Sequence, residues 1–126
     1  MSDPTRRERG AEMMKRVYAG DVAIPPAGAM PFVDLMLEQV FAEVWTREAL
    51  SLKERRLLIM GMIAALGEKD TWQIQVRAAV KNGELTPAQV REALITVANY
   101  AGYPRAAGLI GATEQTLAQL AKEKAG

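Results

Sequence analysis

The feature that most constrains the fold is an unbroken apolar segment, residues 57–66, with the sequence LLIMGMIAAL. Ser51 and Glu54 precede it with the spacing of a capping box, so we expect a helix to begin there. A helix that is apolar on every face must be covered on all sides. Because a chain of 126 residues has little other protein with which to cover it, we expect the protein to form oligomers.

Helical periodicity also dominates the remainder of the chain, and no segment bounded by turn residues alternates apolar and polar residues over five positions. This pattern predicts an all-α fold of about six helices, in a single domain that spans residues 1–126. The expected helices cover residues 4–19, 31–45, 52–66, 69–81, 87–101 and 105–124. Residues 20–31 contain three prolines and two glycines, and we expect an irregular connection there.

Local signals indicate where several of these helices begin and end. Asp3 is the expected cap of the first helix, and residues 82–83, Asn-Gly, are the expected end of the fourth. Residues 86–89 carry a capping box and an early proline, which predict the start of the fifth helix. The second helix is expected to bury one stripe at helical spacing, formed by Phe32, Leu35, Met36, Val40, Phe41 and Val44.

The composition narrows the possible chemistry, because the sequence contains no cysteine and no histidine. This excludes disulfides, thiolate nucleophiles, metal sites built from Cys or His, and Ser-His-Asp triads. A glycine-rich phosphate loop and a dinucleotide-binding fingerprint are also missing from the sequence. We therefore expect no metal and no cofactor, and any catalysis would use Asp, Glu, Lys, Tyr or Arg side chains.

The charge balance and the length of the apolar segments limit the expected partners. The formal net charge is +1, so no basic surplus favours nucleic acid as a partner. The longest apolar segment, residues 57–66, is about half as long as a membrane-spanning helix, and the N-terminal residues do not resemble a secretory signal. We expect a cytoplasmic protein that binds a small molecule and does not bind a membrane.

Four segments together resemble one protein family: EVWTREAL at residues 43–50, AALG at 64–67, VRAAVKNG at 76–83 and ANYAGYPRAA at 98–107. On their order and spacing, the chain is identified as a member of the carboxymuconolactone decarboxylase family over about residues 8–116. The resemblance implies a helical fold similar to that of alkyl hydroperoxidase D, symmetric homo-oligomers such as hexamers or trimers, active sites near subunit interfaces, and no cofactor. It also implies decarboxylation of 4-carboxymuconolactone to an enol-lactone in aromatic compound metabolism.

The sequence departs from the family pattern at a position that matters for proton transfer. Family members usually carry a His two residues before the matched Arg77, and Gln75 stands there in this chain. A Gln side chain donates hydrogen bonds but delivers no proton at neutral pH. Gln75 could donate its amide to an oxygen on which negative charge develops, or it could lie on the helix surface. The peroxide-reducing sister branch, which uses a Cys-x-x-Cys pair, is excluded by the lack of cysteine.

Glu43 and Arg47 are the other candidate catalytic residues. Their four-residue spacing on one helix favours an ion pair between them. If Glu43 instead faces an apolar pocket beside Trp45 and Phe41, desolvation would make its carboxyl group a usable proton donor. Arg47 is the candidate anchor for a substrate carboxylate, because the planar guanidinium matches both carboxylate oxygens.

Arg77, Trp45 and Tyr100 complete the candidate site as substrate-binding residues. Arg77 is the second candidate for a carboxylate anchor, and Tyr100 could offer its phenol hydroxyl to a pocket. Trp45 would line the site, or it would pack in the core or against another subunit. For each of the three, an ordinary surface or core position is the alternative.

The residues and the resemblance together predict a cofactor-independent lyase, which decarboxylates a carboxylated lactone or a related unsaturated or keto acid. Two other functions stay open. One is an isomerase or cyclase acting on a polyketide-like or lactone substrate, and the other is a non-catalytic binding or assembly protein of the same fold. Only the lyase predicts turnover of 4-carboxymuconolactone.

Overall fold

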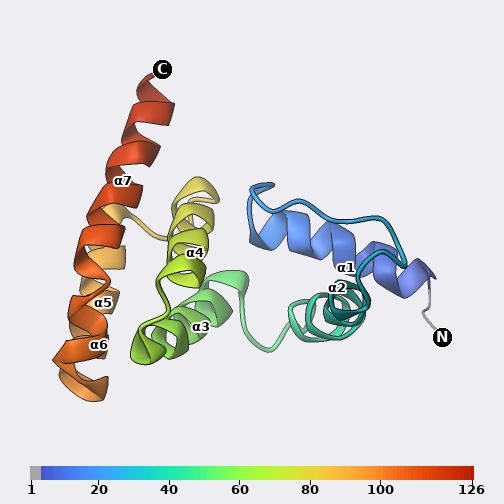
Figure 1. Ribbon diagram of the computed structural model, residues 1–126, viewed down its shortest axis with the longest axis horizontal. Helices are drawn as coiled ribbons and strands as arrows, with labels where there is room; N and C mark the ends of the chain where they lie inside the picture. Colours follow the sequence, from blue (N-terminus) through green and yellow to red (C-terminus); the bar gives the residue numbers. More distant parts are fainter. Residues whose placement is uncertain (1–3) are drawn as a thin grey trace. The chain divides into compact units, whose positions relative to one another are not determined.

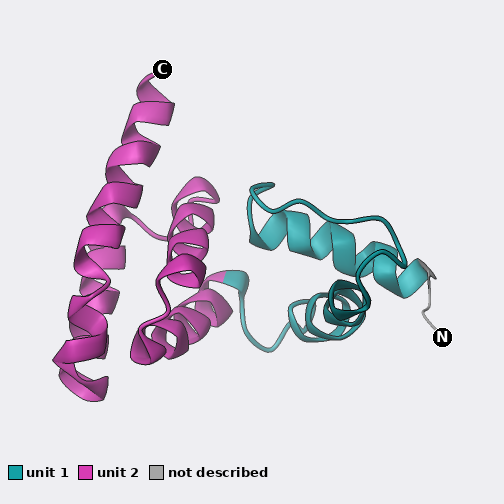
Figure 2. Ribbon diagram, viewed as in Figure 1, with its two compact units in different colours: residues 1–52 teal, residues 53–126 magenta. Residues whose placement is uncertain are grey.

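The computed structural model describes residues 4–126, and these residues form helices and no strand (Figure 1). In chain order the elements are α1 (Pro4–Val17), α2 (Pro31–Met36), the π-helix η1 (Leu37–Val44), α3 (Leu52–Leu66), α4 (Lys69–Lys81), α5 (Pro87–Ala101), α6 (Tyr103–Ala107) and α7 (Ile110–Ala125). The prediction of an all-α fold is confirmed. The chain divides into two compact units, unit 1 (Met1–Leu52) and unit 2 (Lys53–Gly126), shown in Figure 2.

The local signals of unit 2 place α3, α4 and α5 as predicted. α4 has the predicted bounds and ends before Gly83, whose φ of +71° lies in the left-handed region that glycine tolerates. α5 begins at Pro87 with the predicted capping box. In this box Gln89 N donates to Thr86 Oγ1 at 3.2 Å and Thr86 N donates to Gln89 Oε1 at 2.9 Å. α3 begins directly after Ser51.

Two predicted helix ends need correction. α1 ends at Val17 rather than at residue 19, because Ala19 already has a φ of +53°. The predicted last helix is divided into α6 and α7, and at the break Leu109 N bonds Ala106 O, only three residues back, at 3.0 Å. This tighter turn interrupts the α-helical ladder. The expected cap Asp3 lies outside the described residues.

The predicted apolar stripe of the second helix is wrong for most of its members. The exposed ones are Phe32, Leu35, Val40 and Val44. Phe41 is buried as predicted, and the structure also buries Leu37 and Trp45. In the π-helix η1, hydrogen bonds reach one residue further back than in an α-helix, as Trp45 N does to Val40 O at 2.9 Å. Because each turn of η1 then takes up more residues, Val40 and Val44, which are spaced for an α-helix, rotate away from the buried face. Phe32 and Leu35 lie in α2, before the π-helix, and are exposed there.

Unit 1 is built on the contact between α1 and η1. Gly10 of α1 lies directly against the backbone of Leu37, so a Cβ at position 10 would overlap the Leu37 carbonyl group. Beside this close approach, the Phe41 ring lies edge-on to Tyr18, with the ring centroids 5.5 Å apart, and stacks on Trp45 at 6.5 Å. The missing side chain at Gly10 therefore lets the two helices approach each other.

The irregular connection between α1 and α2 is anchored by a buried carboxylate. Asp34 of α2 accepts hydrogen bonds from Arg7 Nε at 2.7 Å and from Gly28 N at 3.0 Å. Arg7 Nη2 also donates to the carbonyl oxygen of Pro25 at 2.7 Å. These bonds tie the connection to α1 and to α2.

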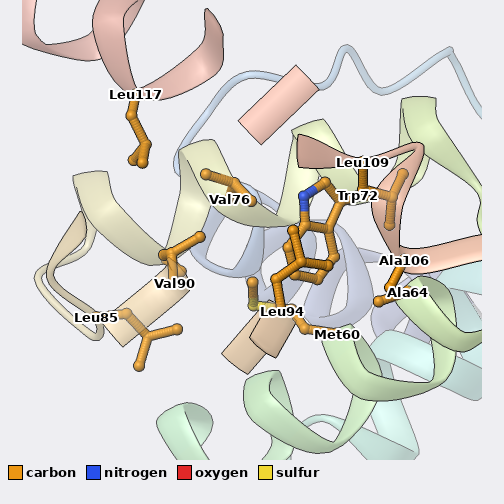
Figure 3. Close-up of a cluster of buried hydrophobic side chains, with 11 residues drawn as sticks. Met60, Ala64, Trp72, Val76, Leu85, Val90, Leu94, Ala106, Leu109 and Leu117 are labelled. Carbon is orange, nitrogen blue, oxygen red and sulfur yellow. The ribbon is translucent and has the colours of Figure 1, made fainter. Parts of the chain in front are cut away.

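Unit 2 is built around Trp72 of α4, which is fully buried. Figure 3 shows its indole ring close to Met60 and Leu109. The indole Nε1 donates to Thr113 Oγ1 of α7 at 2.8 Å, and this hydroxyl donates in turn to Leu109 O at 2.6 Å. The rest of the buried cluster consists of Ala64, Val76, Ala79, Leu85, Val90, Leu94, Ala106 and Leu117. The single polar group of Trp72 is thus satisfied inside the core.

The chain does not cover α3 on all sides, as expected from its length. Met60 and Ala64 are fully buried, whereas Leu58, Met62 and Leu66 are 57%, 53% and 69% exposed. The last three are spaced four residues apart and lie on one face of the helix. Unit 2 by itself therefore leaves an apolar face of α3 uncovered.

Replacing Gly10 with alanine is expected to destabilise the protein, because the new methyl group would overlap backbone atoms of Leu37. Overpacking typically costs about 1–3 kcal/mol. The urea midpoint, followed by far-UV circular dichroism, should fall. Gly111→Ala in α7 is the control: a Cβ there meets nothing within 4 Å, and alanine favours a helix over glycine. An unchanged midpoint for Gly10→Ala would contradict the backbone contact between α1 and η1.

Candidate active site

A buried cluster of three polar side chains lies in unit 2. Arg56 of α3 is fully buried, and its Nε and Nη2 donate to the two carboxylate oxygens of Glu84 at 2.9 and 3.1 Å. Its Nη1 donates to Oε1 of Gln75 at 2.6 Å. A buried guanidinium requires such a partner, and a two-point contact with a carboxylate is among the strongest that it makes.

The turn after α4 brings Glu84 to this cluster. With Gly83 in the left-handed region, the chain reverses so that Glu84 N bonds Ala79 O at 2.9 Å. Asn82 Nδ2 donates to Oε2 of Glu84 at 3.2 Å. The Asn-Gly pair that marks the helix end in the sequence thus also positions a carboxylate against Arg56.

Gln75 belongs to this cluster and does not lie on the helix surface. Its side chain is 3% exposed, which excludes the surface alternative. Its carbonyl oxygen accepts from Arg56, and its amide nitrogen has no hydrogen-bond partner within residues 4–126. Sequence reasoning missed Arg56 and Glu84. The available signal was a pair of arginines, residues 55–56, directly before the apolar segment that was expected to be buried.

The expected ion pair between Glu43 and Arg47 is wrong, since the structure pairs Glu43 with Arg6 of α1 instead. Arg6 Nη2 lies 3.3 Å from Glu43 Oε1, and the two side chains are 36% and 55% exposed. Residues four apart do not stack on one face of a π-helix as they do on an α-helix. Arg47 follows the end of η1 and is exposed. Because Glu43 is exposed, it does not face an apolar pocket.

The three candidate substrate-binding residues occupy different surroundings. Trp45 is buried in unit 1 and stacks on Phe41. Arg77 of α4 makes a two-point contact with Glu123 of α7, at 2.9 and 3.0 Å. Tyr100 is 91% exposed. Glu43, Trp45 and Arg47 thus belong to unit 1, and Gln75, Arg77 and Tyr100 belong to unit 2, where no hydrogen bond joins them.

Unit 2 also contains a pocket of about 310 Å³ between α5, α6 and α7. Its apolar lining consists of Leu94, Ile95, Ala98, Ala106, Ala107 and Ile110, and its polar lining consists of Arg91, Asn99, Tyr103, Thr113 and Glu114. The volume is at the lower end of the range for small-molecule sites. Of the two tyrosines that flank the end of α5, Tyr103 lines the pocket and Tyr100 does not.

Residues 4–126 contain no helix that is long and apolar enough to cross a membrane. The same residues bring together no group of three or more His, Cys, Asp or Glu side chains that could hold a metal ion.

The matches to known proteins fall on the part of the chain that contains the buried cluster. Residues 31–115, more than half of the chain, match the carboxymuconolactone decarboxylase family, and the chain belongs to this family. A nitrosuccinic acid decarboxylase of Metarhizium robertsii is 33% identical over 89 residues, which are 69% of this chain and 60% of the relative. A 4-carboxymuconolactone decarboxylase of Acinetobacter baylyi is 27% identical over 89 residues, which are 71% of this chain and 66% of the relative.

These matches confirm the family predicted from the four sequence segments. The chain spans less than two thirds of the length of either relative. Both relatives are named as decarboxylases, each of a different acid. The family is therefore one of decarboxylases, and the substrate of this chain is a matter for proposal.

The ion pair at the pocket gives a pH prediction. Arg91 donates to both carboxylate oxygens of Glu114 at 2.8 Å, and this hydrogen bonding lowers the pKa of Glu114 from its ordinary value of 4.5. A lowered carboxyl pKa stabilises the fold above the ordinary value, and the contribution is lost as the pH falls through the lowered one. NMR titration of the Glu114 carboxyl carbon should show a midpoint below 4.5.

Arg91→Gln should return this midpoint toward the ordinary value, because it removes the charged donor. Lys122→Gln, an exposed change elsewhere on α7, should leave it in place. A wild-type midpoint at or above 4.5 would contradict the persistence of the pair in solution.

Proposed function

We propose that the protein is a cofactor-independent decarboxylase of a small carboxylic acid, either a carboxylated lactone or a related unsaturated or keto acid. The observation that carries this proposal is membership of the decarboxylase family over residues 31–115. The two relatives support it, because both are named for the loss of a carboxyl group.

The chemistry suits the residues present in the chain. When the bond to the carboxylate carbon breaks, carbon dioxide leaves and an electron pair stays behind. In 4-carboxymuconolactone an oxygen of the lactone carbonyl can take up this charge, and in nitrosuccinic acid an oxygen of the nitro group can. Such a reaction needs an anchor for the carboxylate, a hydrogen-bond donor for the growing oxyanion, and a proton for the carbon afterwards.

We assign these roles to the candidate residues of the sequence analysis, among which Gln75, Arg47 and Arg77 come from the family resemblance. Gln75 is the donor to the oxyanion, and Arg47 and Arg77 are anchors for carboxylates. Glu43 supplies the proton, a role that requires its carboxyl group to move from its exposed position into an apolar pocket. Trp45 and Tyr100 are substrate contacts in this assignment. Two of the roles require an existing ion pair to open, since Glu43 is bound to Arg6 and Arg77 to Glu123.

Purified protein incubated with 4-carboxymuconolactone or with nitrosuccinate should release carbon dioxide from at least one of them. Loss of an essential proton donor typically costs about 10²–10⁴-fold in rate. The decarboxylation rate of Glu43→Gln should therefore be lower than that of the wild type by such a factor. Arg47→Ala should also lose activity, whereas Lys122→Ala, which removes an exposed cation of α7, should not.

Other results of this incubation would favour one of the two alternative functions. A lactone product formed without carbon dioxide would favour the isomerase or cyclase, and binding without any product would favour a non-catalytic protein. If both Glu43→Gln and Arg47→Ala left turnover unchanged, these two assignments would be wrong.

Substitutions at Gln75 test whether this residue acts as a hydrogen-bond donor or as an acid that delivers a proton. Gln75→Ala should lower the rate by about 10- to 1000-fold, the range for a hydrogen bond to developing negative charge. Gln75→His restores the usual family residue and should create or raise decarboxylation of 4-carboxymuconolactone. If no such activity appears, the site around Gln75 has diverged from the family in shape as well.

We further propose that the protein acts as a cytoplasmic homo-oligomer, a hexamer or trimer, in which a second copy covers the exposed apolar face of α3. Gly61 supports this assignment, because a Cβ at this position meets nothing within 4 Å. A larger side chain there would fit a single chain and would disturb only a neighbour packed against it.

Gly61→Leu and Met62→Glu should therefore reduce the mass measured by light scattering. The first crowds the proposed contact and the second places a charge in it. Gln119→Glu, an exposed polar change on α7, is the control. A stable wild-type monomer of 13.8 kDa at micromolar concentration would overturn this proposal.

A further inference from the structure

The orientation of the Gln75 amide is fixed by the chemistry of its neighbour. A guanidinium group carries five N–H donors and no acceptor. The atom that lies 2.6 Å from Arg56 Nη1 must therefore be the carbonyl oxygen Oε1 of Gln75. The other branch of the amide, Nε2, consequently points away from Arg56.

This Nε2 group is a donor without a partner. It makes no hydrogen bond to any described residue, although the Gln75 side chain is 3% exposed. Within residues 4–126, Oε1 of Glu38 is the one fully enclosed side-chain oxygen or nitrogen that lacks a partner. Nε2 is therefore not fully enclosed, although Gln75 as a whole is buried. An amide donor in this situation is available to an acceptor on a ligand.

Glu84 prevents Arg56 from binding the acceptor group of a ligand in place of Gln75. Its two oxygens occupy Nε and Nη2, which form one edge of the guanidinium. This edge would otherwise bind a substrate carboxylate at two points. Asn82 holds Glu84 in place through Oε2. The positive charge is thus neutralised within the protein, and the group offered to a ligand is the neutral amide of Gln75.

We propose that Arg56 and Glu84 are positioning residues that hold Gln75 as a fixed hydrogen-bond donor. This position then takes an acceptor oxygen of the ligand, such as a carboxylate, nitro or enolate oxygen, and rejects groups that only donate. The inference rests on the proposed decarboxylase function and deepens it, because it states which kind of substrate group meets Gln75.

A binding experiment tests the orientation without turnover. Succinate is the probe, since it offers acceptor oxygens and has no group that promotes loss of carbon dioxide. In protein labelled with ¹⁵N, the side-chain amide signal of Gln75 is assigned by its absence in Gln75→Glu. Succinate should shift this signal in the wild type, whereas 1,4-diaminobutane, which carries only donors at neutral pH, should leave it in place.

Arg56→Lys is expected to reduce the succinate shift strongly. Lysine keeps the charge but has one nitrogen, which cannot hold both Glu84 oxygens and Gln75 in the same geometry. If this variant fails to fold, Glu84→Gln replaces it with the same expectation, because it removes one of the two acceptors that orient Arg56. The inference would be overturned if succinate did not shift the Gln75 signal in the wild type. It would also be overturned if the variant that folds showed the same shift as the wild type.

Kinetics separate positioning from a general structural role. With the substrate that turns over, Gln75→Glu should lower kcat by about 10²–10³-fold and change KM little, because it removes a donor to developing charge. Arg56→Lys should lower kcat in the wild-type background but not further in the Gln75→Glu background. A residue that only stabilises the fold would lower kcat in both.

The two proposals can fail separately. If neither acid is decarboxylated while succinate still shifts the Gln75 signal in the wild type and not in Arg56→Lys, the decarboxylase function fails and the positioning role stands. If carbon dioxide is released but the Arg56→Lys effect is the same in both backgrounds, the positioning role fails and the decarboxylase function stands.

Discussion

A guanidinium that is entirely removed from water must be neutralised and hydrogen-bonded within the protein, and unit 2 meets this requirement at Arg56. The partners come from two different places, Gln75 within α4 and Glu84 in the turn that follows it. Removing Glu84 would leave the buried guanidinium without its carboxylate, which costs more than the intact contact contributes. The relative placement of α3, α4 and the turn after α4 therefore depends on this cluster.

Most of unit 2 could be predicted from the sequence, because its helices carry their own boundary signals. The turn at Gly83 and the capping box at Thr86 act within a few residues of where they stand, and the structure contains both. The π-helix of unit 1 has no such signal. η1 packs against α1, and this contact needs a glycine 27 residues earlier than Leu37, which cannot be recognised from hydrophobic spacing. The predicted stripe failed at Val40 and Val44 because α-helical spacing does not hold in the wider turns of η1.

The candidate site was predictable only in part. Resemblance to a family drew attention to Gln75, and the structure shows it buried. Its neighbours Arg56 and Glu84 are 28 residues apart in the chain, so no local pattern connects them. Glu43 shows the opposite error, because a local rule that holds on α-helices paired it with Arg47, while the structure pairs it with a residue of α1. Contacts between distant segments were beyond the reach of local rules.

Because η1 is a π-helix, the direction in which the side chains after it point depends on the number of residues in its turns as well as on their polarity. Each residue of an α-helix turns the chain by about 100° around the helix axis, whereas the wider turns of η1 turn it by less per residue. Through this segment Trp45 ends buried and Arg47 ends exposed. A relative that lost one residue between 37 and 44 and regained regular α-helical turns would keep the Trp-Thr-Arg letters and direct its arginine elsewhere. Identical motifs within this family therefore do not guarantee identical placement of the guanidinium.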